Sequence, residues 1–346
     1  LYGNSVMPVE LFGKQASNIS AGHRFMSGGE FKIAKANDYL ELCRKNFVLP
    51  HFDERKSVIR EQVMDLAAQE EAQLELDEDL LDEVTSLVEW PRALAGGFDR
   101  TFLEVPPEVL ISAMKEHQRY FHLVDKSGRL VPRFITISNI ESLDSSQVVA
   151  GNERVIRPRL ADAAFFFERD TRTSLAEKFG RLENVVFQAD LGTYAEKCRR
   201  ISELAGYIAE QLDLDKDAAT RAGLLCKADL VSDMVSEFPD LQGTMGSYYA
   251  RHHNEADEVC TAIGEHYRPT QSGGILPTSE MASCVALADK IDSLVGIFGI
   301  NQPPTGSRDP FALRRQSLGV IRICVENQLN IPLDGCLAES SRLYGR

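Results

Sequence analysis

The chain has 346 residues and a net charge of −14, and with 43% hydrophobic and 26% charged residues it has the composition of a soluble globular protein of about two domains. No apolar run approaches the roughly 18 residues of a membrane-spanning helix, and the first residues lack a secretory signal pattern, so we expect a cytoplasmic protein without a membrane partner. The acidic charge excludes a nucleic-acid-binding surface spread over the whole protein, because phosphate contacts need basic residues.

The negative charge is concentrated in one stretch of the chain. Residues 65–89 contain ten acidic residues and no Lys or Arg. Such a run is typical of a solvated helical face. RNA binding would therefore have to come from local basic clusters elsewhere.

Several motif-based functions have no support in the sequence. The seven cysteines are scattered and form no C-x-x-C pair, which argues against a disulfide framework and a structural zinc site. We expect reduced, mostly buried thiols. Neither a G-x-x-x-x-G-K-[ST] loop nor a G-x-G-x-x-G fingerprint is present, so nothing predicts ATP binding. The G-x-S-x-G nucleophile motif is also absent.

The first part of the chain mixes helix and strand signals. Residues 53–72 have the pattern of a charged helix with a sparse apolar side. Within residues 124–138, Ser127-Gly128 predicts a turn between two apolar segments, and the second segment is typical of a strand. We therefore predict an α+β domain for residues 1–150.

Helical periodicity dominates from Arg159 onward, and we predict an all-α domain for residues 151–346. Apolar residues recur at intervals of three and four in three segments, namely Ile201, Leu204, Ile208 and Leu212; Leu287, Ile291, Leu294 and Phe298; and Leu318, Ile321, Val325 and Leu329. Such stripes predict helices that bury one face. Turn-forming residues at 269–274 and 301–307 predict loops between helices.

One helical segment has the context of a metal site but not its ligands. In HD-type phosphohydrolases a Leu-Leu pair precedes His-Asp, whose imidazole and carboxylate hold a divalent ion that activates water. Here Leu224-Leu225 precedes Cys226-Lys227, and a protonated lysine repels a cation. The nearby Asp229 has no imidazole beside it. The segment thus resembles a degenerate HD-like domain, in which we expect no metal.

Two other groups of ligand-type residues are weak metal candidates. His252 and His253 are adjacent in sequence, so on a helix they point to different sides and do not easily grip one ion. Asp289 and Asp292 share a helical face, three residues apart. A hydrolase remains open only if a distant histidine completes the site, and we expect surface or otherwise satisfied histidines.

Several uncommon short sequence motifs occur in order along the chain. They are Gly22-His-Arg-Phe-Met26, Glu89-Trp-Pro91, Met114-Lys-Glu-His-Gln-Arg-Tyr-Phe121, Gly151-Asn-Glu-Arg-Val-Ile-Arg-Pro-Arg-Leu-Ala-Asp162, Phe165-Phe-Phe167, and the stretches 222–250 and 286–315. In this combination the chain resembles the β subunit of bacterial heterotetrameric glycyl-tRNA synthetase, which has a degenerate HD-like helical domain. The resemblance implies that residues 1–150 look like the domain shared with the phenylalanyl-tRNA synthetase β subunit, incomplete at its N-terminal end.

The resemblance also implies that two different subunits carry out catalysis and tRNA binding. ATP-dependent activation of glycine, with Mg, and transfer to tRNA take place on a separate α subunit, while β binds tRNA and completes a tetramer of two α and two β chains. This chain would then have no cofactor and no catalytic residue, and its partners would be the α subunit and tRNA, not DNA. Family chains are longer at both ends and end in an anticodon-binding module, so we expect an internal fragment that is inactive alone.

The first basic cluster that could contact tRNA contains Arg154, Arg157 and Arg159. It lies where the character of the sequence changes, and Pro158 is expected to begin a helix. Planar guanidinium groups suit phosphates because they donate hydrogen bonds in pairs. The alternative is that the three arginines pair with nearby acids. Those acids are Glu153, Asp162, Glu168 and Asp170.

A second cluster places Lys115 and Arg119 beside Tyr120 and Phe121. Cations together with aromatic rings could grip a phosphate and stack on a base. The alternative is that Met114 and the two aromatic residues fill a core, with the charges outside it.

The third cluster is Arg314 and Arg315, which are candidates for contact with RNA or a partner. We expect Asp309 to N-cap a helix that begins at Pro310. Two rival function classes stay open besides tRNA binding. One is a metal-dependent HD phosphohydrolase, and the other is a structural scaffold that never touches RNA, which the acidic net charge favours.

Overall fold

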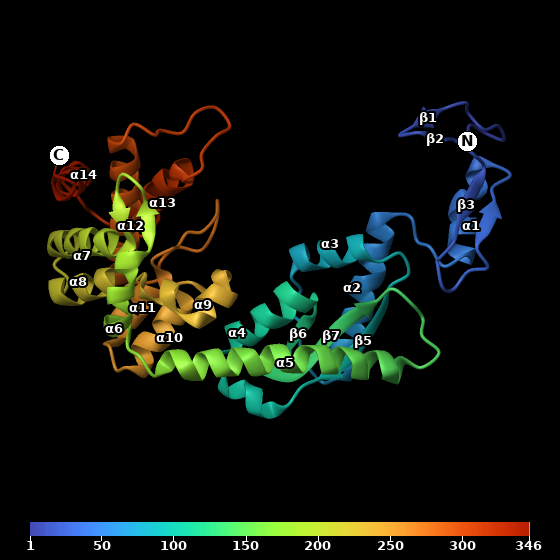
Figure 1. Cartoon of the computed structure of the whole chain (residues 1–346), viewed down its shortest axis with the longest axis horizontal. Helices are drawn as coiled ribbons and strands as arrows, with labels where there is room; N and C mark the ends of the chain where they lie inside the picture. The colour runs from blue at the N-terminus through green and yellow to red at the C-terminus, as the bar shows by residue number, and fades with distance from the viewer. Residues whose placement is uncertain (346) are drawn as a thin grey trace. The chain divides into compact units, whose positions relative to one another are not determined.

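The computed structural model describes residues 1–345 (Figure 1). The chain forms two compact units, Leu1–Ala164 and Phe165–Arg346. Their boundary falls inside the long helix α5 (Ser145–Thr171), which also contains residues 150 and 151, where we expected one domain to end. Pro158 lies within α5 and does not begin a helix, which corrects the expectation drawn from the preference of proline for the first helical position.

The first unit combines small antiparallel sheets with helices, which agrees with the predicted α+β class. Its strands are β1 (Glu10–Leu11), β2 (Lys14–Gln15), β3 (Ile19–Ala21), β4 (Glu30–Lys32), β5 (Arg92–Gly97), β6 (Phe121–Val124) and β7 (Leu130–Ser138). Its helices, apart from α5, are α1 (Tyr39–Lys45), α2 (Phe52–Gln69), α3 (Glu78–Leu87) and α4 (Pro107–Ser112), with helical turns η1 (Ala36–Asp38), η2 (Arg100–Glu104) and η3 (Ala113–His117). The largest sheet has the order β5-β7-β6, and β1 with β2 and β3 with β4 form two-stranded ribbons.

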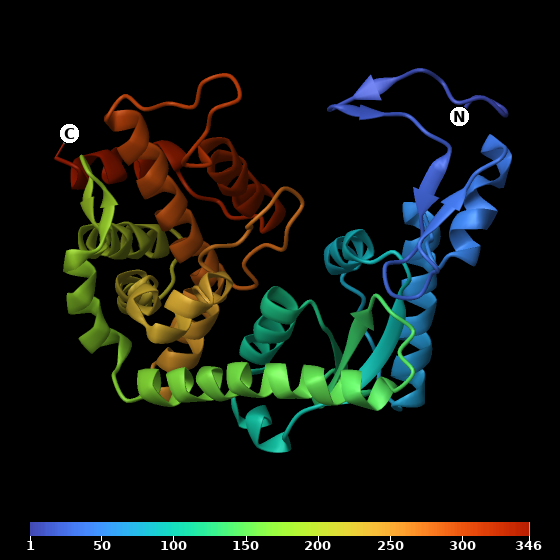
Figure 2. The same cartoon turned by 45° about the vertical axis from the view of Figure 1, so that its right-hand side comes forward.

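The core of the first unit lies where α2 and α3 meet this three-stranded sheet (Figures 1 and 2). Phe121 and Leu123 of β6 are buried there, while the residues between and after them are half-buried, as the two-residue period of a strand requires. The predicted turn is confirmed between β6 and β7. Gly128 adopts a φ of 79°, and the Asp125 carboxylate accepts hydrogen bonds from the backbone N–H groups of Ser127 and Arg129.

The acidic stretch of residues 65–89 is paired with cations from other parts of the same unit. The ion pairs are Lys56–Glu78, Lys56–Asp82, Arg60–Glu78, Lys115–Asp77, Arg119–Glu83 and Arg133–Glu70. Hydrogen bonds from Arg60 and Lys56 lower the pKa of Glu78 to about 2. Exposed pairs of this kind contribute little stability singly. Their effect is to cancel much of the local negative charge.

The second unit is mostly helical. Its helices are α6 (Leu175–Phe179), α7 (Tyr194–Gln211), α8 (Lys216–Leu225), α9 (Asp233–Glu237), α10 (Thr244–His252), α11 (Asp257–Glu265), α12 (Glu280–Gly299), α13 (Leu313–Glu326) and α14 (Leu333–Leu343), with turns η4 (Gly180–Asn184), η5 (Ala228–Val231) and η6 (Pro239–Leu241). A small hairpin, β8 (Val186–Gln188) with β9 (Gly192–Thr193), corrects the prediction that this part is all helix. Gly192, at a φ of 88°, allows its tight turn.

Helix α12 is the central element of the second unit and packs against α7, α11 and α13. Every residue from Met281 to Ser293 is buried. Burial on all sides is typical of an apolar core helix, yet this one contains Asp289, Lys290 and Asp292. These charged residues need partners inside the core.

Only part of the predicted apolar striping faces the core. Ile201, Leu204 and Ile208 of α7 are fully buried, as expected. In α13 the stripe through Leu318, Ile321 and Val325 is instead 45%, 52% and 69% exposed. The helix packs through the opposite side, where Gly319, Val320 and Ile323 are buried. A Cβ at position 319 would lie 3.0 Å from Cε of Lys290, so the missing side chain allows α13 to approach α12 there.

All seven cysteines are free and six are buried, which confirms the expectation that most of them are buried. Burial raises the pKa of Cys284 to about 12, so this thiol stays protonated. Within residues 1–345, no helix combines the length and apolar character that crossing a bilayer would require.

Candidate functional site

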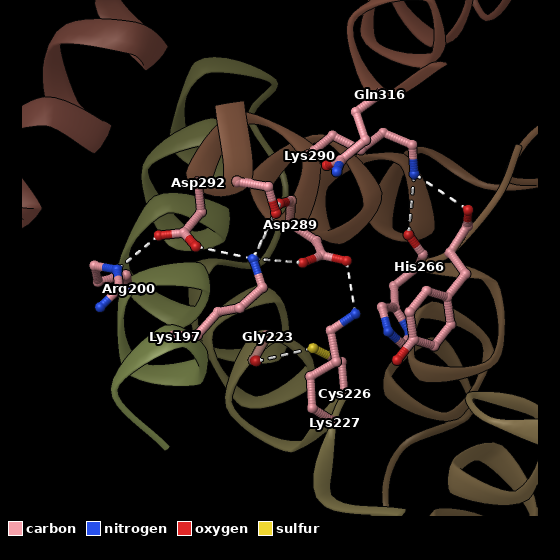
Figure 3. A network of polar contacts seen from close by, with 12 residues as sticks. Lys197, Arg200, Gly223, Cys226, Lys227, His266, Asp289, Lys290, Asp292 and Gln316 are labelled. Carbon is pink, nitrogen blue, oxygen red and sulfur yellow. Dashed lines mark hydrogen bonds and ion pairs between the residues drawn. The ribbon is translucent and has the colours of Figure 1, made fainter. Parts of the chain in front are cut away.

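The site begins at Lys227, which follows the Leu224-Leu225 pair. It follows the end of α8 and is 2% exposed. Its Nζ lies 2.7 Å from Oδ2 of Asp289 on α12, and Oδ1 of the same carboxylate lies 3.0 Å from Nζ of Lys197 on α7 (Figure 3). One buried carboxylate is thus shared by two ammonium groups.

A second carboxylate continues the series. Oδ2 of Asp292 lies 2.9 Å from Nζ of Lys197, and Oδ1 lies 2.7 Å from Nε of Arg200. Two i, i+3 pairs therefore face each other across α7 and α12. We call the series Lys227, Asp289, Lys197, Asp292 and Arg200 the charge ladder (Figure 3).

The charges in the ladder hold one another ionised. Burial alone would raise the pKa of Asp289, but the ammonium groups of Lys197 and Lys227 hold it well below its usual value. Burial alone would lower the pKa of Lys227, but the Asp289 carboxylate raises it. Both residues are therefore charged near neutral pH.

The donor set of the ladder does not fit a metal ion. All four carboxylate oxygens of Asp289 and Asp292 accept from ammonium or guanidinium groups, which would repel a cation. Within residues 1–345, no group of three or more His, Cys, Asp or Glu side chains converges as metal ligands do. The residues present therefore argue against metal-assisted hydrolysis at this place.

Asp229, the carboxylate that sequence reasoning placed near the degenerate motif, is a buried hydrogen-bond acceptor. Its Oδ2 accepts from the backbone N–H groups of Gly243 at 2.6 Å and Gly246 at 3.0 Å. Its Oδ1 has no hydrogen-bond partner among the described residues. Burial raises the pKa of Asp229 to about 6. The residue ties η5 to the start of α10.

The histidines do not form a metal site either. Nε2 of His253 lies 2.9 Å from the carbonyl oxygen of Thr171, which is consistent with a satisfied histidine. His266, which sequence reasoning did not single out, is fully buried with Nδ1 2.6 Å from the carbonyl oxygen of Ile263. Burial lowers its pKa well below the usual value, so the ring is neutral.

A cavity of about 400 Å³ opens beside the ladder. Lys197, Lys227 and Asp289 line it together with Lys290 of α12 and Arg315 of α13. Its aromatic lining consists of Phe187, Tyr194, Tyr267 and Phe311. We call this cavity the lysine pocket. Positive side chains outnumber negative ones along its wall, where Asp240 is the other acid.

Sequence reasoning missed Lys197 and Lys290. A signal was present for both. Lys197 stands four residues before Ile201 on the apolar side of its helix, and Lys290 interrupts the apolar run from Met281 to Ile297. A charge at a core position of a helical pattern indicates a buried ion pair or a binding site.

The cluster around Lys115 and Arg119 is only partly available to a ligand. Nζ of Lys115 lies 2.6 Å from Oδ2 of Asp77, and Arg119 pairs with Glu83. Tyr120 and Phe121 are 3% and 1% exposed, so these rings fill the core and cannot stack on a base. Tyr120 stacks on Phe134 at 4.5 Å and donates to Oδ1 of Asn152.

The arginines of α5 are all exposed but do not share one face. At about 100° per residue, Arg154 and Arg157 lie about 60° apart around the helix, while Arg159 lies nearly opposite Arg157. Three of the acids that could have paired with them are bonded elsewhere. Glu153 accepts from Gly97 N–H, Glu168 pairs with Arg172, and Asp170 accepts from Asp233 N–H, Met234 N–H and Tyr249 OH.

Arg314 and Arg315 are exposed in the first turn of α13. This helix begins at Leu313 and not at Pro310, which corrects our prediction. Ala312, with a φ of 53°, forms a turn before it. The Asp309 carboxylate still accepts from the N–H groups of Leu313 at 2.8 Å and Arg314 at 3.0 Å. Asp309 therefore caps the start of α13, although it lies four residues before the first helical residue.

The ladder predicts strong coupling between Lys227 and Asp289. We expect Asp289→Asn to lower the free energy of unfolding by roughly 3–5 kcal/mol, because it leaves buried ammonium groups short of a counter-charge. The double variant with Lys227→Met should lose less than the sum of the single losses, by about 0.5–3 kcal/mol. Urea unfolding of the four proteins measures this. The exposed pair Glu168 and Arg172 is the control, and additive losses at the ladder would contradict its role.

The raised pKa of Asp229 predicts how the free energy of unfolding changes with pH. Its pKa of about 6 in the folded protein lies above the unfolded value of 3.8, so its contribution to stability is present below about pH 4 and is lost as pH rises to about 6. The difference corresponds to about 3 kcal/mol. Relative to wild type, Asp229→Asn should gain stability between pH 4 and 7. Parallel stability curves over this range would show that burial does not shift the group.

The comparisons with known proteins agree on one family. The sequence model described as glycyl-tRNA synthetase beta subunit matches residues 1–346. Proteins named glycine–tRNA ligase beta subunit are 50% identical in Pseudoalteromonas atlantica and 51% identical in Azotobacter vinelandii over 345 residues, and 48% identical in Shewanella woodyi over 346. Each alignment covers 100% of this chain and 50% of the relative, so the chain spans about half the length of these relatives. The chain belongs to the glycyl-tRNA synthetase β subunit family.

Proposed function

We propose that this chain is a non-catalytic, tRNA-binding and assembly part of a glycine–tRNA ligase β subunit. Glycine is activated with ATP and Mg on the α subunit, and the β chain binds tRNA and joins α in a heterotetramer in the cytoplasm. The observation that carries the proposal is the family match over residues 1–346. Similarity of fold would not be enough, because one fold serves many functions.

The charge ladder supports a binding role over a hydrolytic one. A degenerate HD-like site in which Lys227 is bonded to Asp289 has exchanged metal ligands for fixed positive charge. Lys227 is buried and bonded to Asp289, so it does not contact tRNA itself, but its charge disfavours the metal-bound water that hydrolysis of the HD type needs. Metal-dependent phosphohydrolase activity is therefore the weaker alternative.

Exposed arginines of α5 support contact with RNA. Arg154 and Arg157 lie in the same sector of the helix, and neither is within ion-pair distance of a carboxylate in the described part of the chain. Guanidinium groups without a bonded carboxylate can donate in pairs to phosphate, and the acid that acts on Arg157 is Asp99, whose pKa this guanidinium helps to lower. The pairing of acids in residues 65–89 reduces the repulsion that the net charge of −14 would otherwise cause.

A purely structural scaffold is the second candidate. The observation that favours it is the engagement of Lys115 with Asp77 and of Arg119 with Glu83, which ties two predicted tRNA contacts into the unit itself. Under this alternative, the α5 arginines could be replaced without loss of aminoacylation.

The test is the double variant Arg154→Ala and Arg157→Ala in the full-length β chain with its α subunit. Loss of two phosphate contacts should weaken tRNA binding several-fold and flatten the dependence of log K on log salt by up to about 2. Filter binding at several salt concentrations and glycylation of tRNA measure both effects. Arg129→Ala, an exposed arginine paired with Asp125, is the matched control.

Unchanged affinity together with an unchanged salt slope would reject contact through α5. If glycylation were also unchanged, the scaffold alternative would replace the proposal.

A further inference from the structure

Lys290 is a buried cation without a carboxylate partner at hydrogen-bond distance in the described part of the chain. It is 5% exposed, and its Nζ lies 3.4 Å and 3.3 Å from the carbonyl oxygens of His266 and Tyr267 (Figure 3). Both distances exceed the usual 2.7–3.2 Å range for such bonds. Burial lowers the pKa of Lys290 to about 8 although the Asp289 carboxylate raises it, and Lys227 and Lys197 lower it further. Within residues 1–345, no carboxylate is bonded to this ammonium group.

The neighbouring carboxylates are already occupied. Asp289 is shared by Lys197 and Lys227, and Asp292 by Lys197 and Arg200. Asp229 accepts from backbone N–H groups instead. Adding Lys290 gives four cations to the two carboxylates of the ladder, which is a positive excess in a buried place. Such an excess costs free energy unless an anion offsets it.

The lysine pocket gives that anion a place to bind. Lys290 lines it from α12, and Arg315, which is exposed and forms no ion pair among residues 1–345, lines it from α13. Its volume of about 400 Å³ lies within the roughly 300–1,000 Å³ of small-molecule sites. Lysine ammonium groups lie over the rings of Tyr267 and Phe187. Tyr194 and Phe311 are therefore the rings that offer apolar surface which a simple inorganic anion would not use.

We propose that the lysine pocket binds the phosphate group of a nucleotide, with Lys290 and Arg315 as the cations that contact it and the aromatic wall beside the nucleoside. A free nucleotide and a nucleotide within RNA share this chemistry. The inference uses residues of the second unit alone, so it does not rest on the proposed contact between the arginines of α5 and tRNA.

Adenosine 5′-monophosphate (AMP) and inorganic phosphate are the probes. The protein is the full-length β chain without its α subunit, so that the ATP site expected on α does not contribute. Isothermal titration should show saturable binding of AMP and weaker binding of phosphate. Lys290→Met and Arg315→Ala should each weaken AMP binding at least tenfold. Arg308→Ala removes an exposed arginine outside the pocket and should leave the affinity unchanged.

A competition experiment separates the two sources of phosphate. Displacement of AMP by saturating tRNA would assign the site to a nucleotide of RNA, and simultaneous binding would assign it to a free nucleotide. Both outcomes support a phosphate site. If the Lys290→Met variant fails to fold, Arg315→Ala tests the same pocket, because its side chain is exposed.

Absence of saturable binding of both probes, or equal affinity in wild type and in both pocket variants, would overturn the inference. Neither result would bear on the tRNA affinity of the Arg154 and Arg157 variants, so the two proposals fail separately.

Discussion

The second unit depends on the ion pairing between α7 and α12. Asp289 and Asp292 lie on a helix whose residues from 281 to 293 are all buried, and such carboxylates are tolerated only with cations bonded to them. Lys197 bonds to both carboxylates, so it links two turns of α12 at one point of α7. Buried ion pairs add little net stability over apolar packing, but they penalise any register that separates them. The ladder therefore fixes how these helices pack.

The same pairing decides which chemistry the unit can perform. A carboxylate that accepts from two ammonium groups is a poor ligand for a divalent ion, so the pairing of Asp289 with Lys197 and Lys227 disfavours a metal there. Lys290 stands at the end of this arrangement with only backbone carbonyls near its Nζ. Positive side chains therefore outnumber carboxylates in this part of the second unit.

Sequence reasoning predicted those structural elements that depend only on residues close together in the chain. The helix near residues 53–72, the turn at Gly128 and the buried face of α7 follow from periodicity and turn chemistry alone. The substitution at Lys227 also marked the position of the site, and Asp289 and Asp292 share the face that their spacing predicted.

Predictions failed where tertiary packing outweighed the local pattern. The apolar stripe of α13 is exposed because Gly319, on the other side, permits closer packing against Lys290. Pro158 stands inside α5 although proline favours the first helical turn. The partners of Lys197 and Lys290 could not be predicted from the sequence. Those of Lys197 lie 92 or more residues away, and those of Lys290 lie 23 or 24 residues away. Helical periodicity says nothing about contacts over such separations.

Net charge was the least informative property of the chain, and the structure gives the reason. Five of the ten acids in the run are paired with cations from outside it, so about half of its charge is balanced within the first unit. Arg157 lines one cavity with Glu70 and Glu71 of this run, whereas acids more than about 8–10 Å away are screened at physiological salt. An RNA phosphate near Arg154 or Arg157 would respond to those arginines and their immediate neighbours, not to the total of −14. An acidic protein can therefore bind a polyanion at exposed arginines when most of its acids lie beyond the screening length.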